Sequence, residues 1–161
     1  MTPTELLDEL KVFCETETAN LLLRVKTKPS ASAEIEYKRP AVYKQRIPVL
    51  EDQAKKVPYI LLQVLNGADV QQNGQETSSS CNVRIIVCSY SLDSEEGAAN
   101  TLNIITRLRT ALLKKRVIGQ YFSLVLPLEY ILYPDDTAPY FMGELASSWT
   151  MPTIEREVQL I

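Results

Sequence analysis

The sequence predicts an α+β fold, a two-layer sandwich in which two main helices pack on one face of a mainly antiparallel sheet of four or more strands. Two segments, 3–16 and 93–116, repeat apolar residues at helical spacing behind helix-start signals. Four others, at 59–66, 81–90, 121–133 and 140–151, alternate or run apolar as strands do. Helices segregated onto one face of such a sheet give two layers.

The first helix is expected over 3–16. Thr2 can cap it, Pro3 can occupy its first position, and Glu5 can complete a capping box. The following apolar run at 21–25 can continue the helix or begin a strand, and periodicity does not decide between them. The apolar face of the helix consists of Leu6, Leu7, Leu10, Phe13 and Cys14.

An irregular arm is predicted at about 27–57, because this stretch holds three prolines and mixed charges with two weakly alternating pieces near 35–37 and 42–47. A compact monomer seldom needs so long an irregular connection. Two interpretations stay open, a solvated surface loop and an arm that lies on a neighbouring subunit.

A central strand is expected at 59–66, and the polar residues of 67–80 predict a flexible connection to the strand at 81–90. The second helix starts at Asp93, with Glu96 at the capping-box position. Gly119 is expected to end it. Its buried stripe is predicted to be Leu102, Ile105, Leu108, Ala111 and Leu112. The basic run Lys114, Lys115 and Arg116 fits the helix C-terminus better than a nucleic-acid site.

The last two strands form the natural antiparallel hairpin, joined by the turn PDDTAP. Pro127 predicts a bulge or an edge in the first of them, whose apolar residues alternate from 122 to 132. In the second, 140–151, Leu145 and Trp149 fall on one face and Glu144 on the other. Pro152 then ends the pairing.

Chemistry-bearing motifs are not found. The chain has 161 residues, of which 45% are hydrophobic and 23% charged, which suits one domain spanning 1–161. It has no histidine, the commonest general base and metal ligand, and no phosphate-loop, zinc-protease, nucleophile-elbow or EF-hand pattern. Asp135 and Asp136 fit a turn better than a cation site, which needs more oxygen ligands. We therefore expect no enzymatic activity, no cofactor and no metal.

The cysteines, the net charge and the apolar runs predict where the protein is located. Cys14, Cys81 and Cys88 have no CxxC spacing and are expected to be free buried thiols of a reducing compartment. The net charge of −3 gives no basic field for gripping nucleic acid. No apolar run is long enough to span a bilayer, and the first residues lack the profile of a secretory signal. The expected location is the cytoplasm, without membrane contact.

Three stretches carry a family resemblance: VRIIVCSYSLDSEEG, LNIITRLRTALLKKRVIG and LPLEYILYPDDTAPYFMGELASSWTMPTIEREV. Their order is a strand ending in Tyr-Ser, a helix with an acidic cap, a GELASSW-like strand and a PxIxRE tail. This order resembles the small tail-completion or tail-terminator proteins of siphophages, myophages and prophages. The resemblance covers the last half of the chain, with a weaker echo in RPAVYKQRIP and VPYILLQVLNG.

The resemblance implies a non-enzymatic virion assembly protein that forms a homo-oligomeric ring, usually a hexamer, at the head-proximal end of the tail tube. Such a ring stops tube polymerisation and docks to the head-tail connector, so the implied partners are other copies, the tail tube protein and that connector. DNA passes through the channel without specific binding, which mild acidity suits. The implied location is the host bacterial cytoplasm during assembly and then the virion tail or neck. Another head-tail joining component and a cytosolic adaptor remain alternatives.

Four exposed regions are expected to contact neighbouring subunits or the tube: the arm at 39–47, the connection at 67–80, the turn at 134–139 and the tail from 154. The second face of the sheet also needs a cover, either a partner subunit or the arm of the same chain. The candidate contact residues are Arg39, Tyr43, Arg46, Gln71, Asn73, Asp135, Asp136, Tyr140, Ile154 and Arg156.

Overall fold

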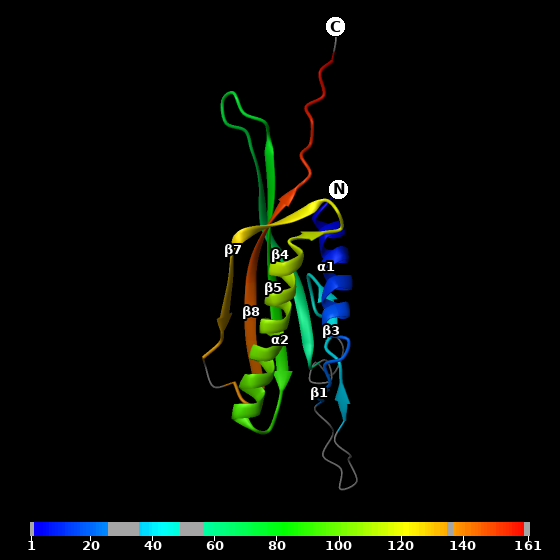
Figure 1. Ribbon diagram of the computed structural model, residues 1–161, viewed down its shortest axis with the longest axis vertical. Coiled ribbons are helices and arrows are strands. Elements are labelled where there is room, and N and C mark those ends of the chain that lie inside the picture. The colour runs from blue at the N-terminus through cyan, green and yellow to red at the C-terminus, as the bar shows by residue number, and fades with distance from the viewer. Residues whose placement is uncertain (1, 26–35, 49–56, 135–136, 160–161) are drawn as a thin grey trace.

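The computed structural model describes residues 2–25, 36–48, 57–134 and 137–159. Within them it has two helices, α1 (Pro3–Glu17) and α2 (Ser94–Lys115) (Figure 1). The strands are β1 (Leu23–Arg24), β2 (Tyr37–Lys38), β3 (Ala41–Lys44), β4 (Tyr59–Val70), β5 (Ser78–Tyr90), β6 (Val117–Ile118), β7 (Phe122–Leu132) and β8 (Tyr140–Met151).

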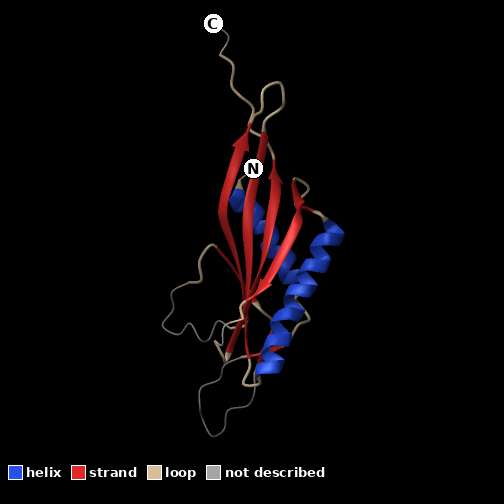
Figure 2. Cartoon of the chain, turned by 90° about the vertical axis from the view of Figure 1, so that its left-hand side faces the viewer, coloured by secondary structure: helices blue, strands red, loops and turns tan. Residues whose placement is uncertain are grey.

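Six strands form one sheet in the order β3-β4-β5-β8-β7-β6, while β1 and β2 pair separately. Its neighbouring strands are antiparallel except for β3 and β4, which are parallel. Both helices cover the same face of the sheet, and in the described residues no helix covers the other (Figure 2). The predicted fold class is confirmed, with six strands in the main sheet.

The first helix begins as its sequence predicts. Thr2 has extended backbone and its Oγ1 accepts the N–H of Glu5 at 3.3 Å, while Glu5 Oε2 accepts the N–H of Thr2 at 2.6 Å. This reciprocal pair satisfies donors that the first turn of a helix leaves without intrahelical partners. The buried residues are the predicted ones: Leu6, Leu7, Leu10, Phe13 and Cys14.

The second helix confirms Asp93 as its N-cap and corrects its predicted end; the Asp93 N–H donates to Ser91 Oγ and not to Glu96, so the predicted capping box is incomplete. Asp93 Oδ1 accepts the N–H of Glu96 at 3.1 Å, as an N-cap should. Arg116, with a φ of 62°, follows the last helical residue, and its N–H donates to the Leu112 carbonyl at 2.9 Å. Gly119 lies beyond β6, in the turn before β7, so the helix ends before the glycine that was expected to end it.

Of the predicted buried stripe of α2, Ile105, Leu108 and Leu112 are buried, whereas Ala111 is half-buried and Leu102 is exposed. Leu102 is 38% exposed, whereas Thr101 is buried and its hydroxyl lies 2.7 Å from Ser89 Oγ and donates to the Phe141 carbonyl at 3.0 Å. A β-carbon added at Gly97 would lie 2.2 Å from the Phe141 ring, so the glycine permits close approach of α2 to β8. Apolar periodicity could not reveal a threonine on the buried face that holds the helix to two strands.

The core lies between the helices and the sheet, and β8 supplies its largest side chain. Trp149 is fully buried, and its Nε1 donates to Ser147 Oγ at 2.9 Å, which in turn donates to the Val83 carbonyl at 2.8 Å. Burial alternates along β8 as the sequence predicts, and the strand ends before Pro152. The core includes Leu6, Leu10, Ile60, Leu62, Ile85, Ile105, Leu108, Leu112, Phe122, Leu124, Leu145 and Trp149.

Much of the connection predicted at 67–80 is strand. Residue pairs from Asn66–Asn82 to Val70–Ser78 continue the β4–β5 ladder, which leaves 71–77 as the loop. The resulting ribbon projects beyond the body of the molecule (Figures 1 and 2). Apart from Ala68 and Val70 its side chains are polar, and most are exposed, so the alternation that marks a half-buried strand is absent.

The predicted irregularity of β7 at Pro127 is confirmed. The pairing of β7 with β8 changes register between Val125 and Glu129, so three residues of β7 oppose one of β8. The bulge interrupts the alternation expected over 122–132, and Leu126 is exposed as a result.

Part of the predicted arm is regular structure. Tyr37–Lys38 pairs with Leu23–Arg24, which resolves the apolar run at 21–25 as coil and strand rather than helix. Ala41–Lys44 joins the main sheet beside β4, with Val42 buried. The rest of the arm, 26–35 and 49–56, lies outside the described residues.

Candidate interaction surfaces

The face of the sheet opposite the helices, here called the open face, has a polar part centred on Arg84. Arg84 Nε donates to Glu144 Oε2 on the neighbouring strand, and its Nη2 donates to the Tyr133 hydroxyl at 2.9 Å. The hydrogen bond to Glu144 is the main cause that raises the pKa of Arg84 above its ordinary value. The guanidinium is thereby held by partners on two sides, and its charge is matched by Glu144.

A second polar chain crosses the open face nearer the projecting ribbon. Asn82 Nδ2 donates to Asn66 Oδ1 at 2.6 Å, and Ser148 Oγ donates to Asn82 Oδ1 at 2.7 Å. These contacts link β4, β5 and β8 through side chains as well as backbone. This part of the open face is therefore suited to contact with water or a polar partner.

The other end of the open face is apolar. Val57, Cys88 and Tyr90 are buried there, with Tyr59, Tyr140 and Met142 packed against them. The Tyr90 and Tyr140 rings lie 5.8 Å apart. A hollow of about 410 Å³ opens beside this cluster, lined by Ile47, Val57, Tyr59, Cys88, Thr137, Tyr140 and Met142.

The β7 edge of the sheet is largely unpaired in the described residues. β6 pairs with β7 at Ser123 and Phe122, and the Arg116 carbonyl accepts the N–H of Leu124 at 2.7 Å. Beyond that point β7 has β8 on one side and no described strand on the other. Exposed on this part are Val125, Leu126, Tyr130 and Ile131.

The β4 edge is paired for part of its length. β3 pairs with Tyr59 to Leu62, and Gln45 extends the pairing because its N–H donates to the Leu62 carbonyl at 2.7 Å and its Oε1 accepts the N–H of Val64 at 2.6 Å. Residues 65–70 have no described neighbour on that side. Leu65, 58% exposed, stands at the register shift where this unpaired stretch begins.

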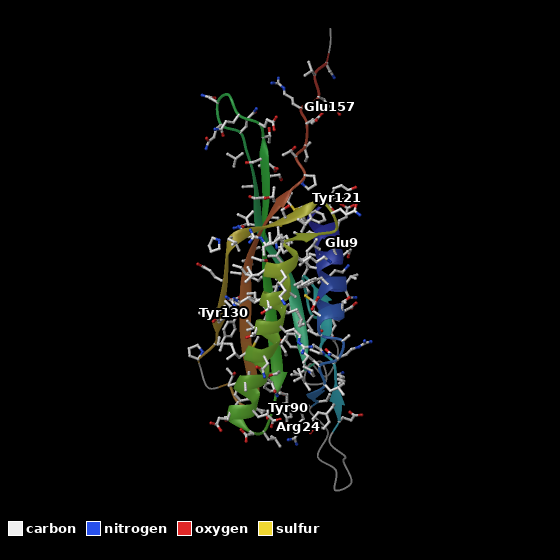
Figure 3. The ribbon with its side chains drawn as sticks, viewed as in Figure 1. Glu9, Arg24, Tyr90, Tyr121, Tyr130 and Glu157 are labelled. Atoms are coloured by element: carbon white, nitrogen blue, oxygen red, sulfur yellow. The ribbon has the colours of Figure 1, made fainter. Side chains whose placement is uncertain are left out.

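The loop of the projecting ribbon and the C-terminal tail lie at the same end of the molecule. Both extend beyond the helices and the rest of the sheet (Figures 1 and 2). Residues 153–159 are exposed and have no regular secondary structure. Figure 3 shows Glu157 on the tail, well clear of the folded body.

The structure places the candidate contact residues in separate groups. Gln71 and Asn73 are exposed in the ribbon loop, at the end where Ile154 and Arg156 leave on the tail. Near β3, Arg39 and Arg46 are exposed, while Tyr43 is half-buried with its ring 6.4 Å from that of Tyr59. Tyr140 belongs to the apolar cluster of the open face. Asp135 and Asp136 lie outside the described residues.

The polar network of Arg84, Glu144 and Tyr133 is absent from the sequence-based candidates. The alternation already put Arg84 and Glu144 on the outward faces of their strands. Their contact follows from the register that sets Arg84 opposite Ala146 and Ile86 opposite Glu144. That register could have been proposed only after pairing β5 with β8, two strands that α2, β6 and β7 separate in the sequence.

The cysteines are free and buried, as predicted. Burial raises the pKa of the Cys14 thiol to about 12 and that of Cys88 to about 11, and it also raises the pKa of Cys81. Such thiols are poor nucleophiles at neutral pH. Among the described residues, no group of three or more acidic, cysteine or histidine side chains is arranged to hold a metal ion. No described helix has the length and apolar character needed to cross a membrane.

Comparisons with known proteins do not name a family. No protein-family model and no curated protein matches the chain. A chain of the virion of a native gene transfer agent particle is similar in structure, with a TM-score of 0.43 and 14% sequence identity. The match covers 69% of the present chain and 78% of that chain. At this level of overlap, the likeness does not assign a function.

Proposed function

We propose that this chain is a non-catalytic structural protein of a phage-type tail, which assembles with copies of itself into a ring at the head-proximal end of the tail tube. The observation that carries the proposal is that the sheet has two unlike partly open edges, at β7 and at β4. A closed ring requires a heterologous contact, in which one patch meets a different patch on the next copy.

The two edges have the character of surfaces that pair. Sheet edges of monomeric proteins are usually blunted by lysines, prolines or bulges. The β7 edge has Pro127 and a bulge, but after them it continues through Tyr130 and Ile131, which is 55% exposed. The N–H of Leu124 points away from β8 and that of Tyr133 points towards it, so by alternation the backbone groups of Tyr130 and Leu132 face the open side.

The partner edge in the proposed ring is residues 65–70 of β4, with Leu65 exposed at its start. Pairing β7 of one copy with this stretch of the next would continue the sheet from subunit to subunit. Main-chain hydrogen bonds would supply affinity, and the exposed apolar side chains on both edges would be covered. Because the two edges differ, the contact repeats around an axis instead of ending at a dimer.

The charge of the chain suits a channel for DNA. The net charge is −3, and the Arg84 guanidinium on the open face is matched by Glu144. A mildly acidic wall would hold phosphates weakly, so DNA would slide past it. The place in the tail, the ring size of six and the tail tube and connector as partners rest on the sequence resemblance.

The first test is the mass of the purified protein by light scattering over a wide concentration range, followed by electron microscopy of large species. We expect a mass near six chains, or rings that form when tail tubes are added. Ile131→Lys should weaken the assembly by at least about tenfold, because it places a charge on the pairing edge. Val12→Lys, at an exposed apolar residue of α1, is the matched control and should assemble normally.

Three outcomes would count against the proposal. A monomer at every concentration that also fails to cap tail tubes would reject ring formation. Binding to filled heads alone, without capping tubes, would favour another head-tail joining role. An inner wall of the ring that proved strongly basic would contradict the proposed passage of DNA.

A further inference from the structure

A groove lies between α1 and α2 on the helix side of the molecule. Its volume is about 750 Å³, and it is open to solvent. One wall is α2, which contributes Arg107, Ala111 and Lys114, and the other is the end of α1 and the residues after it, with Glu17 and Leu21. The groove therefore has a basic wall, an acidic residue opposite, and apolar side chains on both sides.

The positive charge of the α2 wall is not matched by an ion pair in the described residues. Arg107 Nη1 donates to Asn20 Oδ1 at 2.6 Å and to the Glu17 carbonyl at 3.5 Å, both neutral acceptors. Lys115 Nζ lies 5.7 Å from the centre of the Phe13 ring. The helix dipole accounts for cations in the last turn of α2, but its effect has faded at Arg107, two turns earlier.

The C-terminal tail has the complementary pattern. Ile154 is 81% exposed and Val158 is 74% exposed, which is unusual for two apolar residues so close together on an extended segment. In extended chain, alternate residues point to opposite sides, so Glu155 and Glu157 share one side and Ile154, Arg156 and Val158 share the other. The structure gives none of these side chains a hydrogen bond or ion pair within the described residues.

We infer that the groove between α1 and α2 is the docking site for the C-terminal tail of a second copy of this chain. Glu155 and Glu157 face the basic wall of α2, with Arg107 and Lys114 as their partners. The opposite side of the tail then faces α1, where Arg156 meets Glu17.

The spacings and the apolar residues agree with this placement. Glu155 and Glu157 are about 7 Å apart along an extended chain. Arg107 and Lys114 are about 10 Å apart along the helix, a difference that long side chains span. Ile154 and Val158, on the side that faces α1, gain the apolar cover of Leu21, which is half-buried in that wall of the groove.

A second copy is the natural donor because of the direction in which the tail leaves. The tail continues away from the end of the sheet, beyond the N-terminal end of α1 (Figure 1). The groove lies along the helices, so a chain would have to reverse to reach its own groove. When each copy places its C-terminal tail in the groove of the next copy, the contact is heterologous, and a ring can repeat it. The inference rests on the proposed self-association, but it does not depend on a phage tail.

Cysteine trapping tests the contact in the full-length chain, because the native cysteines are buried and their pKa values are raised. Chains carrying Glu157→Cys are mixed with chains carrying Lys114→Cys under mild oxidation. We expect a covalent dimer of one chain of each kind, at several times the yield of either chain alone. A mixture of Glu157→Cys with Glu95→Cys, at an exposed residue at the far end of α2, is the control and should form no covalent mixed dimer.

Charge reversal gives an independent readout. Glu155→Lys with Glu157→Lys should weaken self-association by at least about tenfold, and combining it with Arg107→Glu and Lys114→Glu should restore much of the loss. Absence of the mixed dimer would overturn the inference, as would trapping within one chain when both cysteines are on the same molecule. Rings that form normally with the reversed tail would overturn it while leaving the proposed function intact.

Discussion

The two faces of the main sheet are stabilised in different ways, although they share the same strands. On β8, Leu145 and Trp149 point to the helices and are fully buried among apolar side chains. The residues before each of them, Glu144 and Ser148, point to the open face and are held by single polar partners. Burial of large apolar side chains contributes more stability than partly exposed polar pairs do. The covered face should therefore set the stability of the fold, and the open face and edges should be free to serve contacts.

The largest effect should come from Trp149→Ala, which removes a fully buried side chain at the centre of the covered face. We expect it to lower the free energy of unfolding by about 3–5 kcal/mol. Thr150→Ala, at the next residue on the open face, should change it by less than about 0.5 kcal/mol. Denaturant unfolding followed by circular dichroism suits both, since Trp149 is the single tryptophan. Similar losses for the two variants would contradict the difference between the faces.

A smaller loss is expected from Thr101→Val, on the covered face. The substitution keeps the shape of the side chain but leaves Ser89 Oγ and the Phe141 carbonyl without the Thr101 hydroxyl. Loss of a partner for buried polar groups costs about 1–3 kcal/mol. The matched control is Thr110→Val on the exposed side of the same helix, which should be near neutral. Thermal and denaturant unfolding of the Thr101→Val and Thr110→Val variants tests whether the lost polar contact, and not a change in helix propensity, causes the loss of stability.

On the open face, Glu144→Gln should lower the free energy of unfolding by about 1 kcal/mol, because it weakens a charge-assisted hydrogen bond to Arg84 that is only partly shielded from water. The effect should shrink as salt is raised. Glu129→Gln, at an exposed position on β7, is the control. A loss as large as that of Trp149→Ala would mean that the open face contributes to stability as strongly as the core.

The smallest effect is expected in the alkylation rates of two thiols, one on the open face and one in the helix layer. Cys88, on the open face, has a raised pKa of about 11, and Cys14, in the helix layer, one of about 12. In alkylation followed by mass spectrometry at pH 8, Cys88 should react roughly tenfold faster than Cys14, because its thiolate fraction is higher. Both values lie above the ordinary 9.0, so neutral thiols favour folding fully below about pH 9, and that stabilisation is lost as the pH rises towards 11 and 12. Equal alkylation rates for the two thiols would show that global unfolding controls the access of the reagent to both.

Sequence patterns were accurate where one local cause decides the structure. The Thr2 cap, the apolar face of α1 and the alternation of β8 all follow from spacing alone and are confirmed. Sequence patterns were wrong where backbone conformation or pairing beyond the local apolar pattern determines the structure. Gly119 did not end α2, because Arg116 takes the left-handed conformation earlier. The ribbon at 67–80 is strand because its backbone is paired, although its side chains carry no apolar signal.

By itself, the sequence determined the fold class, the helix starts, the covered face of the sheet and the exposed C-terminal tail. These depend on propensity, capping and periodicity, which act over a few residues. The tertiary structure alone decided which edges are left unpaired, how Arg84 meets Glu144 and that α1 and α2 frame a basic groove. Each of these depends on the order and register of strands far apart in the chain, and no local pattern of residues encodes that order.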